Sequence, residues 1–247
     1  MTETRLTQHR PLPVDERIAT GIPGFDEMVE GGFPRGSLVS TSGRPGTGKT
    51  IFGSQFLYAG GLLGQPGMYV SMLESRKAYM RNKLRLGLDF EPLERKGMFK
   101  FLEMPTLAAD GLPAVWEEIV RNVEAQGNVR LVIDSFTAMA QAFQNQGELR
   151  AFTHTLLSRI IAGAGSTTLM ITESPGAQSH IGAGVEEFIA DGVIQFSLVP
   201  VAGDARVRTV EIMKMRGTNH QMGPIPIEIS DRGLVVRHPH VRRPAQS

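Results

Sequence analysis

Residues 43–50 read GRPGTGKT, which fits the pattern G-x-x-x-x-G-K-[ST] of a phosphate-binding loop. The loop follows a buried-strand pattern at residues 37–41 and precedes an apolar helical pattern at residues 51–63. A strand, a glycine-rich loop and a helix in this order direct backbone N–H groups and the positive end of a helix dipole at one anion. The stretch therefore predicts an α/β fold that binds phosphate.

The side chains of the loop predict that the ligand is a nucleoside triphosphate with a magnesium ion. Lys49 would reach the β- and γ-phosphates, and the Thr50 hydroxyl would complete an octahedral Mg²⁺ shell. We expect ATP or ADP to contact most of the loop and the start of the helix, namely Gly43, Pro45, Gly46, Thr47, Gly48, Lys49, Thr50 and Ile51.

Length and composition limit the remaining possibilities. The 247 residues suffice for one large α/β domain and are too few for two such nucleotide-binding domains. A net charge of +1 argues against a dedicated nucleic-acid or membrane-surface binder. The chain has no cysteine, no apolar run long enough for a membrane span and no signal-peptide pattern at its start. We expect a cytoplasmic protein.

The chain divides into three parts by its patterns. Residues 1–16 are polar and predict a flexible arm, residues 17–238 predict one ATPase domain, and residues 239–247 predict a flexible tail. The expected strands lie at residues 37–41, 68–73, 98–102, 130–134, 167–172, 193–199, 206–215, 225–229 and 234–237, and the expected helices at 51–63, 76–86, 112–123 and 149–162.

The order of these elements predicts the architecture. Strands and helices alternate in the first part of the domain, whereas the strand patterns after residue 193 follow one another without helices. Alternation favours a parallel sheet with helices on both faces, and successive strands favour antiparallel pairing. We therefore expect a mostly parallel central sheet flanked by helices, with an antiparallel extension at its C-terminal edge.

Two carboxylates follow expected strand ends. Asp134 ends an apolar strand, and in an open α/β sheet the strand ends gather at the ligand, so we expect Asp134 to hold Mg²⁺ near the loop. Glu74 would lie beside the loop strand in a doubly wound sheet, where it could take a proton from the attacking water. Alternatively, Glu74 is an acid at the start of the helix that begins near Arg76, where the helix dipole favours it.

Several stretches outside the loop match one family together. They are GIPGFDEMVEGGFPRGS at residues 21–37, YVSMLES at 69–75, residues 82–89, LVIDSFTAM at 131–139, GVEEFIADGVIQF at 184–196 and KMRGTNHQMGPIPIEISDRG at 214–233. In these segments the chain resembles the KaiC (circadian-clock) family of RecA-superfamily ATPases. The clock protein itself carries two such domains in one chain, so this chain resembles the single-domain relatives.

The resemblance implies a RecA-like fold and a hexameric ring with each nucleotide between neighbouring subunits. It adds Arg85, Lys214, Met215, Arg216, Thr218, His220, Ser230 and Asp231 to the nucleotide site. Lys214 and Arg216 would reach the γ-phosphate bound by the adjacent subunit and act as arginine-finger-like cations, with Ser230 and Asp231 near the base or ribose. Without the resemblance, the two cations could simply be outward residues of an edge strand.

The chain departs from the family at Leu73, because the family has two adjacent glutamates after its second strand and Glu74 matches the second. If the first glutamate is the main base, hydrolysis is slow here, since general-base catalysis contributes about 10²–10⁴-fold. If Glu74 alone orients the water, activity survives. The Leu73 side chain could also pack beneath the sheet.

Three functions remain open, and the first fits best. The chain could be a ring-forming ATPase that couples its nucleotide state to a protein partner, a recombinase-like DNA-binding ATPase, or a serine/threonine autokinase. Residues 174–184 carry no lysine, arginine or aromatic residue, which disfavours DNA. Residues 184–192, which correspond to the family's autophosphorylated segment, contain no serine, threonine or tyrosine.

Overall fold

The computed structural model describes the central part of the chain. It covers residues 17–104, 111–126, 130–141, 143, 145, 147–151, 165–173, 189–201 and 205–238. The arm at 1–16, the tail at 239–247 and most of the helix expected at 149–162 lie outside these residues. The loop at 174–184 and most of the segment at 184–192 lie outside them as well.

The described elements follow the expected order. They are β1 (Arg17–Ile18), the 3-10 helix η2 (Asp26–Val29), β2 (Phe33–Pro34), β3 (Leu38–Gly43), α1 (Lys49–Leu62), β4 (Gly67–Ser71), α2 (Arg76–Leu84), α3 (Glu91–Arg95), β5 (Phe99–Glu103), α4 (Leu112–Gln126), β6 (Arg130–Asp134), α5 (Phe136–Ala140), β7 (Thr167–Ile171), β8 (Gly192–Pro200), β9 (Arg206–Met215), β10 (Ile225–Ser230) and β11 (Gly233–Val236).

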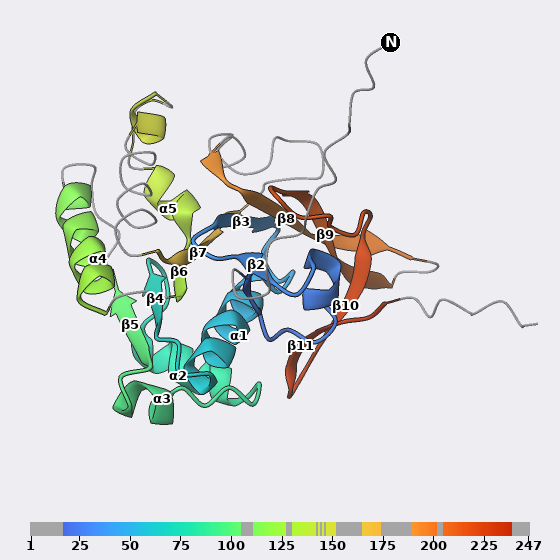
Figure 1. Ribbon diagram of the computed structural model, residues 1–247, viewed down its shortest axis with the longest axis horizontal. Coiled ribbons are helices and arrows are strands. Elements are labelled where there is room, and N and C mark those ends of the chain that lie inside the picture. The colour runs from blue at the N-terminus through green and yellow to red at the C-terminus, as the bar shows by residue number, and fades with distance from the viewer. Residues whose placement is uncertain are drawn as a thin grey trace, which may run out of the picture.

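One large sheet organises the described residues, with the strand order β11-β10-β9-β8-β3-β7-β6-β4-β5 (Figure 1). The strands from β8 through β3 to β5 are parallel, and β9, β10 and β11 continue the sheet in antiparallel fashion. This arrangement confirms the predicted mostly parallel sheet with an antiparallel C-terminal extension. No helix in these parts of the chain has the length and apolar character that a membrane span requires.

Helices cover both faces of the parallel strands, and successive strand residues divide between the two resulting cores. On β6, Val132 packs in the core beneath α1, whereas Leu131 and Ile133 pack in the core beneath α4. Figure 1 shows α1 and α4 on opposite sides of the sheet. Burial of both faces explains why this strand reads as an unbroken apolar run.

The sequence missed the shortest elements. The helices α3 and α5 have five residues each, and β1 pairs with β2 in a separate two-stranded ribbon. Helical periodicity needs a longer window than five residues, so these elements carry no periodic signal. Local capping identifies α5 instead, because the Ser135 side chain accepts a hydrogen bond from the Ala138 N–H at 3.2 Å.

A buried amide ties α1 to the antiparallel extension. The Gln55 side chain on α1 accepts a hydrogen bond from the Leu234 N–H at 2.6 Å and donates one to the Leu234 carbonyl at 3.1 Å. Both residues are almost completely buried. Because α1 starts at the phosphate loop, this contact brings the turn between β10 and β11 close to the loop.

We predict that Gln55→Leu lowers the free energy of unfolding by about 2–4 kcal/mol, because it leaves two buried backbone groups of Leu234 without partners. Denaturant unfolding measures the loss. Gln221→Leu is the matched control, since Gln221 is exposed. Equal stability of the two variants would contradict the importance of this contact.

Candidate functional site

The phosphate loop needs glycine for backbone conformation and for close approach. Gly43 has a φ angle of 151°, and a Cβ atom there would lie 2.3 Å from the carbonyl oxygen of Phe196 on β8. Gly46 and Gly48 have φ angles of 79° and 112°. Residues other than glycine rarely adopt such φ angles, so the loop conformation depends on glycine at these three positions.

The start of α1 leaves its first N–H groups free for a ligand. Gly48 is the N-cap residue, and no side chain caps the helix. The first turn of a helix has N–H groups without intrahelical partners and lies at the positive end of the helix dipole. The first turn of α1 contains no acidic side chain that could interact with the positive end of the dipole. The local geometry therefore favours an external anion.

Lys49 points back across the loop. Its ammonium donates to the Gly43 carbonyl at 2.7 Å and to the Arg44 carbonyl at 3.0 Å. Burial lowers the pKa of Lys49, and the charges of Glu173 and Asp134 raise it in part. The two carboxylates thus help to keep a cation where phosphate charge is expected.

Thr50 and Asp134 meet at the carboxyl edge of the sheet. The Thr50 hydroxyl donates to Asp134 Oδ2 at 2.9 Å, and the Tyr69 hydroxyl donates to the same oxygen at 2.5 Å. Burial, with the nearby Asp134 charge, raises the pKa of Tyr69 well above its usual range, so its phenol remains a neutral donor.

This donor set fits a magnesium ion. A hydroxyl and a carboxylate are hard oxygen ligands, and Mg²⁺ is typically held by one or two protein ligands together with water and substrate phosphates. Within the described residues no group of three or more histidine, cysteine or acidic side chains could hold a metal ion. The hydroxyl of Thr50 and the carboxylate of Asp134 suit a Mg²⁺ ion whose other ligands are water and nucleotide phosphates.

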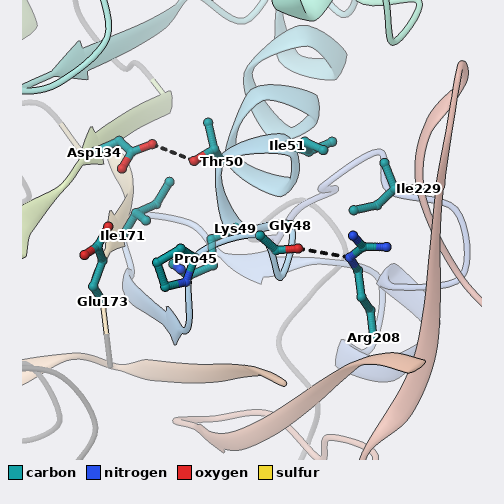
Figure 2. A pocket seen from close by; sticks show the side chains of 11 residues that line it. Pro45, Gly48, Lys49, Thr50, Ile51, Asp134, Ile171, Glu173, Arg208 and Ile229 are labelled. Atoms are coloured by element: carbon teal, nitrogen blue, oxygen red, sulfur yellow. Dashed lines mark hydrogen bonds between the residues drawn. The ribbon is translucent and has the colours of Figure 1, made fainter. Parts of the chain in front are cut away.

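A cavity of about 370 Å³ opens over the loop, a volume typical of small-molecule sites. Figure 2 shows Asp134 and Glu173 on one side of it and Arg208 and Ile229 on the other, with Lys49 between them. Its lining comprises Pro45, Gly46, Gly48, Lys49, Thr50, Ile51, Asp134, Ile171, Glu173, Arg208 and Ile229.

Arg208 and Ile229 line the cavity, although the sequence did not indicate that they lie at the nucleotide. Arg208 on β9 donates from Nε to the Gly46 carbonyl at 3.0 Å, and Ile229 on β10 faces the start of α1. No local sequence pattern indicates that either residue lies at the nucleotide. Their positions result from the strand order of the sheet extension and from the contact between Gln55 and Leu234.

Glu74 does not lie beside the loop strand, and this expectation was wrong. The strand β4 is separated from β3 by β7 and β6, because the later strand β7 inserts next to β3. Glu74 follows the end of β4, which is the strand next to the one that ends at Asp134. Its carboxylate accepts a hydrogen bond from Asn82 at 2.7 Å and does not line the loop cavity. It lines a neighbouring cavity of about 340 Å³. Leu73 is 69% exposed and does not pack beneath the sheet.

The two cations expected to act across an interface lie far from their own loop. The strand β9 runs antiparallel to β8. Arg208 therefore lies at the end of β9 near the loop, and Lys214 lies at the other end of the same strand. Their positions are six residues apart along the strand, which corresponds to about 20 Å. Lys214 donates to the Ala190 carbonyl at 2.7 Å, and Arg216 pairs with Asp191 at 3.2 Å.

The remaining expected residues form two groups. The turn that carries Ser230 and Asp231 lies against the loop after α2 that carries Arg85, since a Cβ atom on Gly87 would lie 2.9 Å from the Asp231 carbonyl oxygen. None of these residues lines the phosphate-loop cavity.

The other group lies on the distant side of the molecule. Met215, which ends β9, is buried, and Thr218 follows with its hydroxyl accepting from the buried Arg17 at 3.2 Å. His220 is only partly buried.

Comparisons with known proteins give matches over most of the chain. The family model described as "ATPase: KaiC" matches residues 18–241. A UPF0273 protein of Pyrococcus horikoshii is 35% identical over 239 residues, covering 89% of this chain and 93% of the relative. The circadian clock oscillator protein KaiC of Thermosynechococcus vestitus is 34% identical over 243 residues, covering 92% of this chain and 46% of that protein.

A solved structure is similar in fold as well as in sequence. The crystal structure of a KaiC-like protein from Pyrococcus horikoshii superposes with a TM-score of 0.79 and 38% identity. The match covers 90% of this chain and 99% of that chain. The fold is therefore the RecA-like fold of a KaiC-like protein.

We predict that Lys49→Ala weakens ATP binding about 10- to 100-fold, because a hydrogen bond to a charged group contributes about 1.5–3 kcal/mol. Isothermal calorimetry measures the affinity. Lys77→Ala on the exposed face of α2 is the control and should bind like the unaltered protein. Unchanged affinity in Lys49→Ala would remove the loop from the site.

Proposed function

The chain belongs to the KaiC family of ATPases, and from this membership we propose that it is a cytoplasmic, magnesium-dependent ATPase of low turnover. In this proposal it assembles into a ring with a nucleotide at each subunit interface and acts as a regulatory or signalling module through a protein partner. The observation that carries the proposal is the convergence of Lys49, Thr50 and Asp134 at the cavity over the glycine loop.

Three side chains of the cavity have a defined task in the proposed hydrolysis. Lys49 and the N–H groups of the loop would hold the β- and γ-phosphates as charge builds on the transferring group. Thr50 and Asp134 would hold Mg²⁺, which neutralises phosphate charge when it is bound. Phosphoryl transfer needs positioning and electrostatic stabilisation more than covalent chemistry, and a preformed loop supplies both.

We assign the orientation of the attacking water to Glu74. Its strand is hydrogen-bonded to the strand of Asp134, with Ser71 in register with Asp134, so Glu74 follows on the same edge of the sheet. The hydrogen bond from Asn82 fixes its carboxylate. Because Leu73 stands where the family has a first glutamate, this proposal includes slow hydrolysis.

The position of Lys214 and Arg216 supports a site shared between subunits. The two cations lie at the edge of the sheet opposite the loop of their own chain, so within one chain they do not reach its phosphates. The Arg216 side chain is 58% exposed and is therefore accessible to a neighbouring copy. A ring of identical subunits would place these cations at the adjacent loop, where a planar cation stabilises transition-state charge.

Anchoring of the segment after β9 supports the same role. The buried guanidinium of Arg17 donates to the Thr218 hydroxyl at 3.2 Å and to the Gly217 carbonyl at 3.4 Å. Asp191 pairs with Arg216 and also accepts a hydrogen bond from the Leu38 N–H at 3.0 Å. These contacts fix the segment to the start of β3, which suits a group that must be positioned before a partner binds.

We predict that mixing two inactive variants restores hydrolysis. Arg216→Ala should lower turnover by about 10³-fold or more if it removes an arginine finger. Lys49→Ala should be inactive because it binds ATP about 10- to 100-fold more weakly and lacks the cation at the transferring phosphate. In a mixed ring, an Arg216→Ala loop lies beside an intact Arg216 from a Lys49→Ala subunit. Phosphate release measures the recovery.

The control mixture combines Lys49→Ala with Asp134→Ala. Both substitutions damage the loop half of the site, so no interface becomes complete and no recovery is expected. A monomeric mass in the presence of ATP and Mg²⁺, or equal behaviour of the two mixtures, would argue against shared sites.

We predict that the unaltered protein turns ATP over far below the median enzyme rate of about 10 s⁻¹. Glu74→Gln should lower the remaining rate by about 10²–10⁴-fold while sparing ATP binding. Leu73→Glu should raise the rate without loss of thermal stability, because the Leu73 side chain is exposed and the new charge is not buried.

Leu84→Glu is the control for the added charge, since Leu84 is 58% exposed at the end of α2. It should leave turnover unchanged. A folded Leu73→Glu protein with unaltered turnover, together with an undiminished Glu74→Gln rate, would show that the base lies elsewhere.

A further inference from the structure

Tyr69 occupies a buried position behind the metal-binding edge. It lies in the middle of β4 and is 1% exposed. Its ring stacks on Phe101 with 5.6 Å between ring centroids and contacts Tyr79 at 4.5 Å. In the parallel register Tyr69 is opposite Val132, so Asp134 is its diagonal neighbour on the next strand. A tyrosine side chain is long enough to span this diagonal.

The hydroxyl of Tyr69 fixes one oxygen of the Asp134 carboxylate. Asp134 Oδ2 accepts from Tyr69 at 2.5 Å and from Thr50 at 2.9 Å. Within the described residues, Asp134 Oδ1 has no hydrogen bond from a side chain or backbone donor. The Thr50 hydroxyl can donate to Asp134 and still present its lone pairs to a cation. Two donors on different elements, Tyr69 on β4 and Thr50 on α1, thus hold the Oδ2 atom of the carboxylate.

We propose that Tyr69 is a positioning residue for the magnesium ion, because its hydroxyl orients the Asp134 carboxylate toward the cation. This inference rests on the magnesium site of the proposed function. Outer partners of metal ligands set the orientation of the ligand, and their loss typically lowers metal affinity about 10- to 100-fold. The role differs from catalysis, since Tyr69 lines no part of the cavity over the loop.

Tyr79 provides a matched comparison within the same cluster of aromatic rings. It is also fully buried, but its hydroxyl donates to Ser54 Oγ at 2.9 Å, and Ser54 in turn donates to the Thr50 carbonyl at 2.6 Å. Tyr79 therefore supports the backbone of α1, and its hydroxyl hydrogen bond goes to Ser54 and not to Asp134. Loss of either phenol hydroxyl removes one buried hydrogen bond, so the two losses should destabilise the fold alike.

The test measures ATP binding at increasing Mg²⁺ concentration in Tyr69→Phe, Tyr79→Phe and the unaltered protein. The Mg²⁺ concentration for half-maximal enhancement of ATP affinity should rise about 10- to 100-fold in Tyr69→Phe and stay unchanged in Tyr79→Phe. Thermal melting should show similar stability losses. Equal Mg²⁺ dependence in the two variants would overturn the proposal. Absence of any Mg²⁺ effect in the unaltered protein would instead overturn the magnesium site.

A second measurement on the unaltered protein covers the case in which Tyr69→Phe does not fold. The chain contains three tyrosines, so a protein labelled with ¹³C at the tyrosine phenol carbon gives three signals. Adding Mg²⁺ to the ATP-bound protein should shift the Tyr69 signal and leave that of Tyr58, whose ring contacts Phe90, in place. An unmoved Tyr69 signal, with Mg²⁺-dependent ATP binding intact, would also overturn the role of Tyr69.

Discussion

The parallel alignment of β3, β7, β6 and β4 is the constraint on which the site depends. Parallel pairing in register places the carboxyl ends of all four strands along one edge. Gly43, Glu173 and Asp134 each lie at or just after one of these ends. The strands contribute residues that are distant in sequence, and the register alone brings them to one cavity. A slip of one residue in any pair would turn these side chains to the other face.

The helix α1 converts this edge into a binding site. Its first turn supplies backbone donors and Thr50, and its buried face packs on the sheet through Phe52 and Phe56. Several hydrogen bonds link it to the sheet, among them the one from Thr50 to Asp134 near its start and the pair between Gln55 and Leu234 further along. Because buried polar groups are costly unless they are paired, these contacts fix where the helix lies.

The antiparallel extension gives the molecule two chemically different edges. Its strand β9 carries Arg208 at the end near the loop and Lys214 at the other end. The turn after β10 returns to α1 and places Ile229 at the cavity. One continuous sheet can therefore form a nucleotide cavity on one edge and present a fixed cationic segment at the opposite edge. This separation gives the proposal of shared sites a structural basis.

The sequence by itself determined the glycine loop, the strand and helix around it, and the carboxylate that ends β6. These features depend on local patterns, since glycine permits the loop angles and a run of apolar residues marks a buried strand. It also determined the change from alternating elements to successive strands. Only the tertiary structure decided that β7 inserts between β3 and β6, which separates the strand before Glu74 from the loop strand by two strands and brings Glu173 to the cavity. Strand order and the placement of Arg208, Ile229 and Tyr69 depend on packing between distant segments, for which no local pattern exists.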